Sequence, residues 1–327
     1  MTDLPVKGSA WNSSPMALAP HTRTRPADPD DAAGLTVRRI TPGEAQGARR
    51  AIRSWMDRVC AGGTPLDQLY GGFDPGGALS AAAILVPQPG RTGLIFAAPP
   101  SCGPEVSALG QVLRACCDRA PRQQVTLAQA LLSPSERREA KALAQAGFEK
   151  LARLAYMQAR IPRSPVAPPP PAGVELRPYD PTLHNQFIAA LESTYEQTRD
   201  CPGLRGLRRT DDVLQGHRGV GLFDASLWTL VRIGGRPAGV VLLNRVPASG
   251  SVELVYLGVA PEHRRKGLGA TLLQRAICQC AQRGESYMTL AVDTANAPAM
   301  ALYRRWSFRR TATRDVWILP LAQKPRH

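Results

Sequence analysis

The chain has 327 residues, of which 43% are hydrophobic, and its 41 Lys and Arg against 26 Asp and Glu give a net charge of +15. This length exceeds what one ordinary hydrophobic core fills, so we expect two domains. No apolar run approaches the roughly 20 residues that a membrane-spanning helix needs, so no membrane partner is expected. The seven cysteines include no CxxC pair, which argues against a disulfide framework or a zinc site and favours the reducing cytoplasm as the compartment.

The first half of the chain shows a regular alternation of strand and helix patterns. Residues 1–34 contain five prolines and no continuous apolar segment, which predicts a disordered tail and not a secretory signal. Residues 62–77 are rich in glycine and proline and are predicted to be a loop. The predicted strands are 35–40, 78–86, 93–98, 125–132 and 151–161, and the predicted helices are 42–60, 105–119 and 135–147.

A proline-rich segment follows, PRSPVAPPPPAG at residues 162–173. Proline cannot donate to a strand ladder and favours an extended conformation, so we predict a semi-rigid spacer between two domains. A ligand for a proline-binding partner domain is the alternative interpretation.

The second half repeats the first in outline, at a spacing of about 140 residues, which suggests two copies of one domain. Residues 201–221 are predicted to be loop-rich and partly helical. The predicted strands are 174–178, 226–233, 237–246, 251–259, 287–293 and 310–319, and the predicted helices are 182–197, 268–283 and 297–306.

The most informative stretch is residues 253–270, ELVYLGVAPEHRRKGLGA, where a buried strand leads into a helix through a basic turn. A helix start offers unpaired backbone N–H groups and the positive end of the helix dipole, which together suit a phosphate group. Gly267 and Gly269 let the backbone approach a ligand closely, and the cations at residues 264–266 add positive charge around the same spot.

Together with VDTANAPAMALYRRWSF at residues 292–308, this stretch resembles the GNAT superfamily of acyl-CoA-dependent N-acyltransferases, over residues 174–321. The resemblance implies an α/β (α+β) fold of two tandem GNAT domains, each a mixed central β-sheet flanked by helices. It implies a degenerate GNAT-like domain at residues 35–161, a catalytic domain at 174–321 and a tail at 322–327. The tandem arrangement is similar to that of the mycothiol synthases. Acetyl-CoA is the implied cosubstrate, and no metal is expected.

The resemblance also implies roles for individual residues. Glu253 would be the general base, although a glutamate that faces solvent or pairs with an arginine at a strand edge remains open. Tyr303 would protonate the departing thiolate, with a core tyrosine as the alternative. The implied cofactor-binding residues are Leu257, Gly258, Val259, Arg264, Arg265, Lys266, Gly267, Leu268, Gly269, Ala270, Asn296 and Tyr303. Ser307 stands where the family has glycine, so either the serine is strained or the turn differs.

The acceptor side is less defined by the sequence. Glu192, Tyr195, Glu196 and Asp200 fall where the family shapes its acceptor pocket, and an acidic pocket would suit a cationic amine, but the sequence favours a solvated helix face. His217 has no partner at metal-ligand spacing, so no metal is assigned to it.

The predicted function is N-acetyltransfer from acetyl-CoA to a primary amine of a small molecule or a protein. Direct transfer in a ternary complex is expected, because no cysteine lies at a nucleophile position. A non-catalytic CoA-sensing or nucleic-acid-binding regulator is the alternative. The arginines are spread along the chain and aromatics amount to only 6%, so a nucleic-acid partner is not favoured. The sequence does not indicate an oligomeric state.

Overall fold

The structure is a computed structural model in which the chain forms two compact units. Unit 1 comprises residues 153–313, and unit 2 comprises the described residues before Arg153 and from Arg314 onward. The predicted tails lie outside the described residues, apart from Gly34. The described residues are 34–40, 44, 48, 50–61, 69–121 and 124–321.

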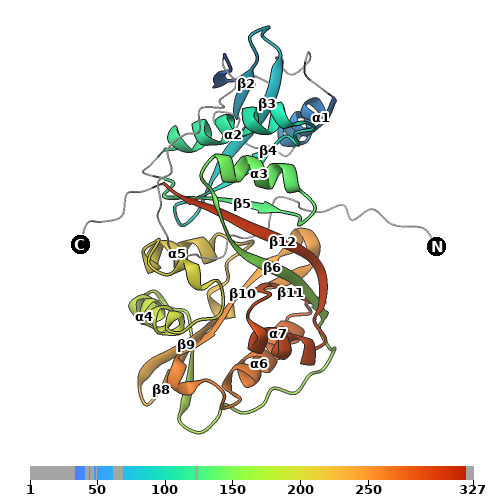
Figure 1. The fold of residues 1–327 in the computed structure, drawn as a ribbon. Coiled ribbons are helices and arrows are strands. Elements are labelled where there is room, and N and C mark those ends of the chain that lie inside the picture. Colours follow the sequence, from blue (N-terminus) through green and yellow to red (C-terminus); the bar gives the residue numbers. More distant parts are fainter. Residues whose placement is uncertain are drawn as a thin grey trace, which may run out of the picture. The chain divides into compact units, whose positions relative to one another are not determined.

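Unit 2 is a mixed sheet with helices on both faces (Figure 1). Its strands follow the order β1-β2-β3-β4-β5-β12. One core cluster lies between this sheet and helices α2 and α3, and a second lies under α1. The elements are β1 (Thr36–Arg39), α1 (Arg50–Ala61), β2 (Leu69–Phe73), β3 (Leu79–Gln88), β4 (Thr92–Ala97), α2 (Gly103–Asp118), β5 (Leu127–Leu132) and α3 (Arg137–Gln145).

Strand β2 corrects the prediction of a loop over residues 62–77. The segment LYGGF is fully buried and pairs with both β1 and β3. A Cβ atom on Gly71 would lie 2.6 Å from Leu79 Cδ1 and 2.7 Å from Ile40 Cγ2. The glycines are therefore required by close packing inside a sheet, which local sequence patterns do not distinguish from a turn.

Within the described residues, unit 1 has the same order of elements as unit 2, with one more helix. Its strands follow the order β6-β11-β10-β9-β8-β7. Helices α6 and α7 cover one core cluster, and α4 and α5 cover another on the opposite face of the sheet (Figure 1). The elements are β7 (Val174–Pro178), α4 (His184–Tyr195), α5 (Thr210–Arg218), β8 (Trp228–Ile233), β9 (Arg236–Val246), β10 (Ser251–Val259), α6 (Leu268–Gln282), β11 (Tyr287–Asp293) and α7 (Ala297–Arg305).

The two halves of the sequence exchange their last strands. Strand β6 (Glu149–Arg160) follows α3 but pairs along residues 154–160 with β11 of unit 1. Strand β12 (Arg309–Pro320) follows α7 but pairs along residues 315–320 with β5 of unit 2. The unit boundaries therefore fall inside β6 and β12 and not at residues 162–173.

The proline-rich segment lies inside unit 1, where it connects β6 to β7, and this differs from the predicted spacer between domains. Side chains of α6 hold it, because Gln274 Nε2 donates to Val166 O at 3.2 Å and Arg275 Nη1 donates to Pro168 O. The extended conformation expected from proline is thus used to cross unit 1.

Within the described residues, no helix combines the length and the apolarity needed to cross a bilayer. The same residues contain no group of three or more His, Cys, Asp or Glu side chains placed to hold a metal ion.

Helix α7 ends at the position where serine replaces the expected glycine. Ser307 has a φ of 61°, in the left-handed region, and the Phe308 amide donates to Tyr303 O at 3.1 Å. The turn that the family's glycine would make is therefore kept, and the serine carries the conformational cost.

We predict that Ser307→Gly stabilises the protein by about 0.5 to 1 kcal/mol, because glycine adopts this φ without steric cost. The measurement is the shift of the urea unfolding midpoint. Ser193→Gly, in helix α4, is the matched control and should destabilise by a similar amount. Destabilisation by Ser307→Gly would contradict the assignment of strain to this turn.

Candidate active site

The parallel strands β10 and β11 diverge soon after they begin. They pair only along Ser251–Glu253, whereas β10 continues to pair with β9 as far as Val259 and β11 pairs with β6 along its whole length. The register of β10 against β9 shifts between Leu254 and Tyr256, which marks a bulge that bends the strand. Beyond the bulge, the β10 edge that faces β11 has no strand neighbour among the described residues.

A tight loop joins the end of β10 to helix α6. Gly267 caps the helix with a φ of 79°, and a Cβ atom added there would meet nothing within 4 Å. The amides of Ala270 and Thr271 donate to Gly267 O at 3.0 and 3.1 Å, whereas those of Leu268 and Gly269 have no acceptor among the described residues. The first turn of α6 contains no acidic side chain, so this helix start can accept an anion.

Arg264, which the sequence predicted as one of the cofactor-binding cations, anchors the loop. Its guanidinium donates to three backbone carbonyls, those of Val259 at 2.8 Å, Thr194 at 2.9 Å and Gln197 at 3.2 Å. It therefore ties the loop to the end of β10 and to helix α4. The exposed side chains of Arg265 and Lys266 remain as the cations of the loop.

The glycines of this region meet different requirements. A Cβ atom on Gly269 would lie 3.9 Å from Leu257 Cδ2 and 4.0 Å from Leu302 Cδ2, so the start of α6 is close to both β10 and α7. A Cβ atom on Gly258 would lie 2.8 Å from Thr194 Cβ. Gly258 is therefore explained by the close approach of helix α4 to β10.

Helix α7 places the two predicted residues Asn296 and Tyr303. Asn296 caps the helix by accepting a hydrogen bond from the Ala299 amide at 3.3 Å. Tyr303 is buried, and burial, with further contributions from Asp200 and Tyr256, raises the pKa of its hydroxyl. Tyr303 is thus protonated at neutral pH.

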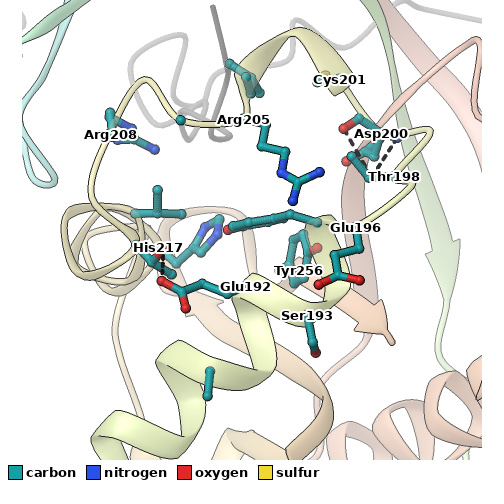
Figure 2. Close-up of a pocket in the computed structure, with 16 residues that line it drawn as sticks. Glu192, Ser193, Glu196, Thr198, Asp200, Cys201, Arg205, Arg208, His217 and Tyr256 are labelled. Atoms are coloured by element: carbon teal, nitrogen blue, oxygen red, sulfur yellow. Dashed lines mark hydrogen bonds between the residues drawn. The ribbon is translucent and has the colours of Figure 1, made fainter. Parts of the chain in front are cut away.

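A cavity of about 520 Å³ lies on the other face of β10, between α4, α5 and the loop that connects them (Figure 2). Thr210 Oγ1 of α5 donates to Glu192 Oε1 of α4 at 2.9 Å and holds the two helices together. Figure 2 shows Arg205 extending from the loop toward the residues of α4. The lining residues are Ala189, Glu192, Ser193, Tyr195, Glu196, Thr198, Asp200, Cys201, Leu204, Arg205, Gly206, Arg208, Thr210, Val213, His217 and Tyr256.

Two aromatic residues line the cavity with polar atoms that have no hydrogen-bond partner among the described residues. These atoms are the Tyr195 hydroxyl and both ring nitrogens of His217. Burial, helped by the positive charge of Arg208, lowers the pKa of His217 to about 3, so its ring is neutral. The ring stacks on Tyr256 with 5.6 Å between ring centroids. The cavity therefore presents donors and acceptors that a polar ligand could satisfy.

Asp200 is the most perturbed carboxyl group of the cavity. Burial raises its pKa to about 6, against the lowering effect of a hydrogen bond from the Asp293 amide at 3.1 Å. Hydrogen bonds between Thr198 and the backbone of Asp200 fix the loop at this point.

Glu253, the predicted base, does not line this cavity. It lies near the start of β10, opposite Asn244 of β9 and Thr289 of β11, on the segment where β10 and β11 still pair. The structure therefore brings together the loop, the free edge of β10 and Tyr303. Glu253 lies outside this group, nearer the start of β10.

Residues 191–308, which contain β10, β11, the loop before α6, Tyr303 and every cavity-lining residue except Ala189, match the model of the Acetyltransferase (GNAT) family. Unit 1 belongs to the GNAT family.

The GNAT likeness extends over most of the chain in three dimensions. A GCN5-related N-acetyltransferase from Sphaerobacter thermophilus matches 91% of this chain and 98% of its own, with a TM-score of 0.55 and 19% sequence identity. At this identity the match shows the fold alone, and it confirms the predicted fold class.

Sequence relatives match shorter parts of the chain. A mycothiol acetyltransferase of Clavibacter michiganensis subsp. michiganensis is 42% identical over 28% of this chain and 29% of its own length. A mycothiol acetyltransferase of Salinispora tropica is 33% identical over 49% of this chain and 52% of its own length. The chain thus spans about half or less of the length of these relatives.

The GNAT features of unit 1 are only partly repeated in unit 2. Strands β4 and β5 also pair in parallel along three residues, Thr92–Leu94 of β4. At the start of α2, however, Glu105 Oε2 accepts hydrogen bonds from the Ser101 amide at 2.7 Å and from Ser101 Oγ at 2.9 Å. A carboxylate of the chain itself therefore stands at the start of α2, where α6 has no acidic side chain.

Several residues that line the cavity were not found from the sequence. Arg205, Arg208 and Tyr256 were not singled out, and His217 was considered only as a metal ligand. The loop before α5 contains no recognisable motif. Only the acidic residues near its start, Glu196 and Asp200, indicated a pocket from the sequence.

We predict that Arg264→Ala lowers the free energy of unfolding by about 2 to 4 kcal/mol, because it removes charge-assisted hydrogen bonds to three carbonyls. Urea unfolding measures the change. Lys266→Ala, two residues away and exposed, is the control and should stay within about 0.5 kcal/mol of the parent. Equal losses in the two variants would show that Arg264 does not anchor the loop.

Proposed function

We propose that the protein is an N-acetyltransferase that moves the acetyl group of acetyl-CoA to the primary amine of a small molecule, by direct transfer in a ternary complex. The observation that carries the proposal is the divergence of β10 and β11, with an anion-accepting loop on one side of β10 and a polar cavity on the other. Acetyl-CoA would supply an activated thioester. Side chains and backbone amides of unit 1 would bind the cofactor, polarise the thioester carbonyl and transfer protons.

The loop between β10 and α6 fits a pyrophosphate group. Gly267 leaves open space where a side chain would otherwise stand, and the amides at the start of α6 are available as donors. Arg265 and Lys266 add positive charge that Arg264, bound to carbonyls, does not provide. We therefore assign pyrophosphate binding to residues 265–270.

The free edge of β10 fits the amide-containing arm of the cofactor. Residues 257–259 pair with β9 through one edge only, so main-chain donors and acceptors remain on the other. An extended ligand can add to such an edge as a strand would. One of these amides would then polarise the thioester carbonyl.

Proton transfer needs a group on each side of the reacting bond. Tyr303, whose raised pKa keeps its hydroxyl protonated, would donate to the departing sulfur. Glu253 is the base that the family resemblance implies, and because it does not line the cavity it could take the amine's proton only by way of water or another side chain. Asn296 would support the site indirectly, as the cap of the helix that carries Tyr303.

The cavity supports a small-molecule acceptor over a protein amine. Its volume of about 520 Å³ is in the usual range of sites for small ligands. The carboxylates of Glu192, Glu196 and Asp200 line it and suit a cationic amine. Because relatives are named mycothiol acetyltransferases, the unacetylated form of mycothiol is the first acceptor to test.

Unit 2 is proposed to be a degenerate GNAT domain that binds no acetyl-CoA. Three prolines, Pro99, Pro100 and Pro104, stand around the start of α2 and offer no N–H group. The Glu105 carboxylate at the same helix start would repel a phosphate group. These features support a structural role for unit 2.

We predict that Gly267→Asn weakens acetyl-CoA binding at least tenfold, about 1.4 kcal/mol, because the side chain enters the space proposed for the pyrophosphate. Asparagine tolerates a positive φ, so the fold should be retained. The matched control is Gly284→Asn at the other end of α6, where φ is 76° and the space is equally open. A calorimetric titration in which both variants bind like the parent would contradict the loop assignment.

We predict acetyl-CoA-dependent thiol release with at least one amine of a panel that includes unacetylated mycothiol. Tyr303→Phe should lower kcat about a hundredfold and leave the Kd of acetyl-CoA within about threefold, since it removes only the proton donor. Tight acetyl-CoA binding without turnover on any amine would instead favour a CoA-sensing regulator. Salt-sensitive binding to nucleic acid without acetyl-CoA binding would favour the nucleic-acid alternative.

A further inference from the structure

The carboxyl group of Asp200 lines the cavity and accepts a hydrogen bond from the amide of Asp293, the last residue of β11. We propose that Asp200 accepts the proton that the acceptor amine loses during acetyl transfer, an inference that rests on the proposed function. It gives the chain a base that lines the acceptor cavity, which Glu253 does not do.

The position of Asp200 follows from three elements that meet at the divergence of β10 and β11. Asp200 lines the cavity from the loop after α4. It accepts a hydrogen bond from the amide of Asp293, at the end of β11, at 3.1 Å. Its negative charge contributes to the raised hydroxyl pKa values of both Tyr256 of β10 and Tyr303 of α7. An amine bound against Asp200 is thus near both the strand edge and the proposed proton donor.

The carboxylate is held in place but keeps the capacity to accept more hydrogen bonds. The Asp293 amide and the Asn296 side chain donate to it, whereas a carboxylate offers about four acceptor positions. No Lys, Arg or His side chain in the described part of the chain forms an ion pair with Asp200. Asp200 is half-buried, and a partly desolvated carboxylate without a cationic partner is suited to an ammonium group of a ligand.

The groups that face Asp200 explain why it can exchange a proton near neutral pH. Burial is the largest effect, and the Asp293 carboxyl adds to it, so that against the two hydrogen bonds the pKa of Asp200 is raised to about 6. The other titratable neighbours, Cys201, Tyr195 and the tyrosines of β10 and α7, are uncharged at neutral pH because burial raises each pKa. A base with a pKa slightly below the working pH is mostly ionised and still basic enough to act.

In the proposed step, the acceptor nitrogen loses two protons. Asp200 takes one proton from the ammonium group and frees the nitrogen lone pair. The nitrogen then bonds to the acetyl carbon, and the carbon–sulfur bond breaks. Tyr303 gives its proton to the sulfur and regains one from the nitrogen as the amide forms. Asp200 releases its proton to solvent through the cavity.

The test is the pH profile of kcat/KM between pH 5 and 9 for the full chain, with the amine that gives thiol release. In the parent we expect a tenfold rise per pH unit below about 6, since Asp200 must be ionised. Asp200→Asn should lose this inflection and lower kcat at least a hundredfold. Asp180→Asn, an exposed carboxyl away from the cavity, is the control and should keep the inflection.

An Asp200→Asn variant that keeps the inflection, with kcat within about threefold of the parent, would overturn the proposal. If this variant fails to fold, Asp200→Glu is the variant to measure. Its carboxyl group takes a new position, so the inflection should move by at least about half a pH unit. An unchanged inflection would overturn the proposal. Absence of thiol release in the parent with every amine is a separate result, which rejects the proposed function itself.

A second readout does not depend on turnover. The raised pKa means that the folded state disfavours the ionised carboxyl, so the parent should lose stability relative to Asp200→Asn as the pH rises from about 4 through about 6. Thermal unfolding at pH 4 and pH 7.5 measures this difference, and a pH-independent difference would contradict the buried, proton-exchanging carboxyl that the proposal requires.

Discussion

The structure of unit 1 depends on the point at which β10 stops pairing with β11. A bulge between Leu254 and Tyr256 bends β10 after only three parallel pairs, and β11 remains fixed to β6 on its other side. Backbone groups of β10 that a sheet would normally satisfy are thereby exposed to a ligand. The loop and α6 then begin at the end of this free edge, which places an anion-accepting helix start beside it.

Strand β10 also separates an apolar core from a polar cavity. On one face of β10, α6 and α7 pack over an apolar core that contains Tyr303, and on the other face α4 and α5 enclose the polar cavity. Arg264 links the two sides, because it binds carbonyls of both β10 and α4. A change in the loop is therefore expected to alter the position of α4 beside the cavity as well as the proposed cofactor site.

The sequence predicted what is determined locally. The turn at Gly267 follows from a short segment whose glycine permits a positive φ, whereas at Ser307 the sequence left open a strained serine or a different turn, and the structure has the strained serine. Strand β2 was missed because Gly71 and Gly72 are selected by packing against residues from other elements. The exchange of β6 and β12 was missed because a strand pattern does not specify its partner. Asp200 received no special role from the sequence, since its environment is made by Asp293, which lies 93 residues later.

The central claim is that acetyl-CoA binds along the free edge of β10 and at the start of α6. Hydrogen exchange of backbone amides, with and without acetyl-CoA, tests it most directly because it reports the donors themselves. The account predicts slower exchange at residues 257–259 and 265–270 and no change at the start of α2. Protection at the start of α2, or no protection along β10, would contradict it.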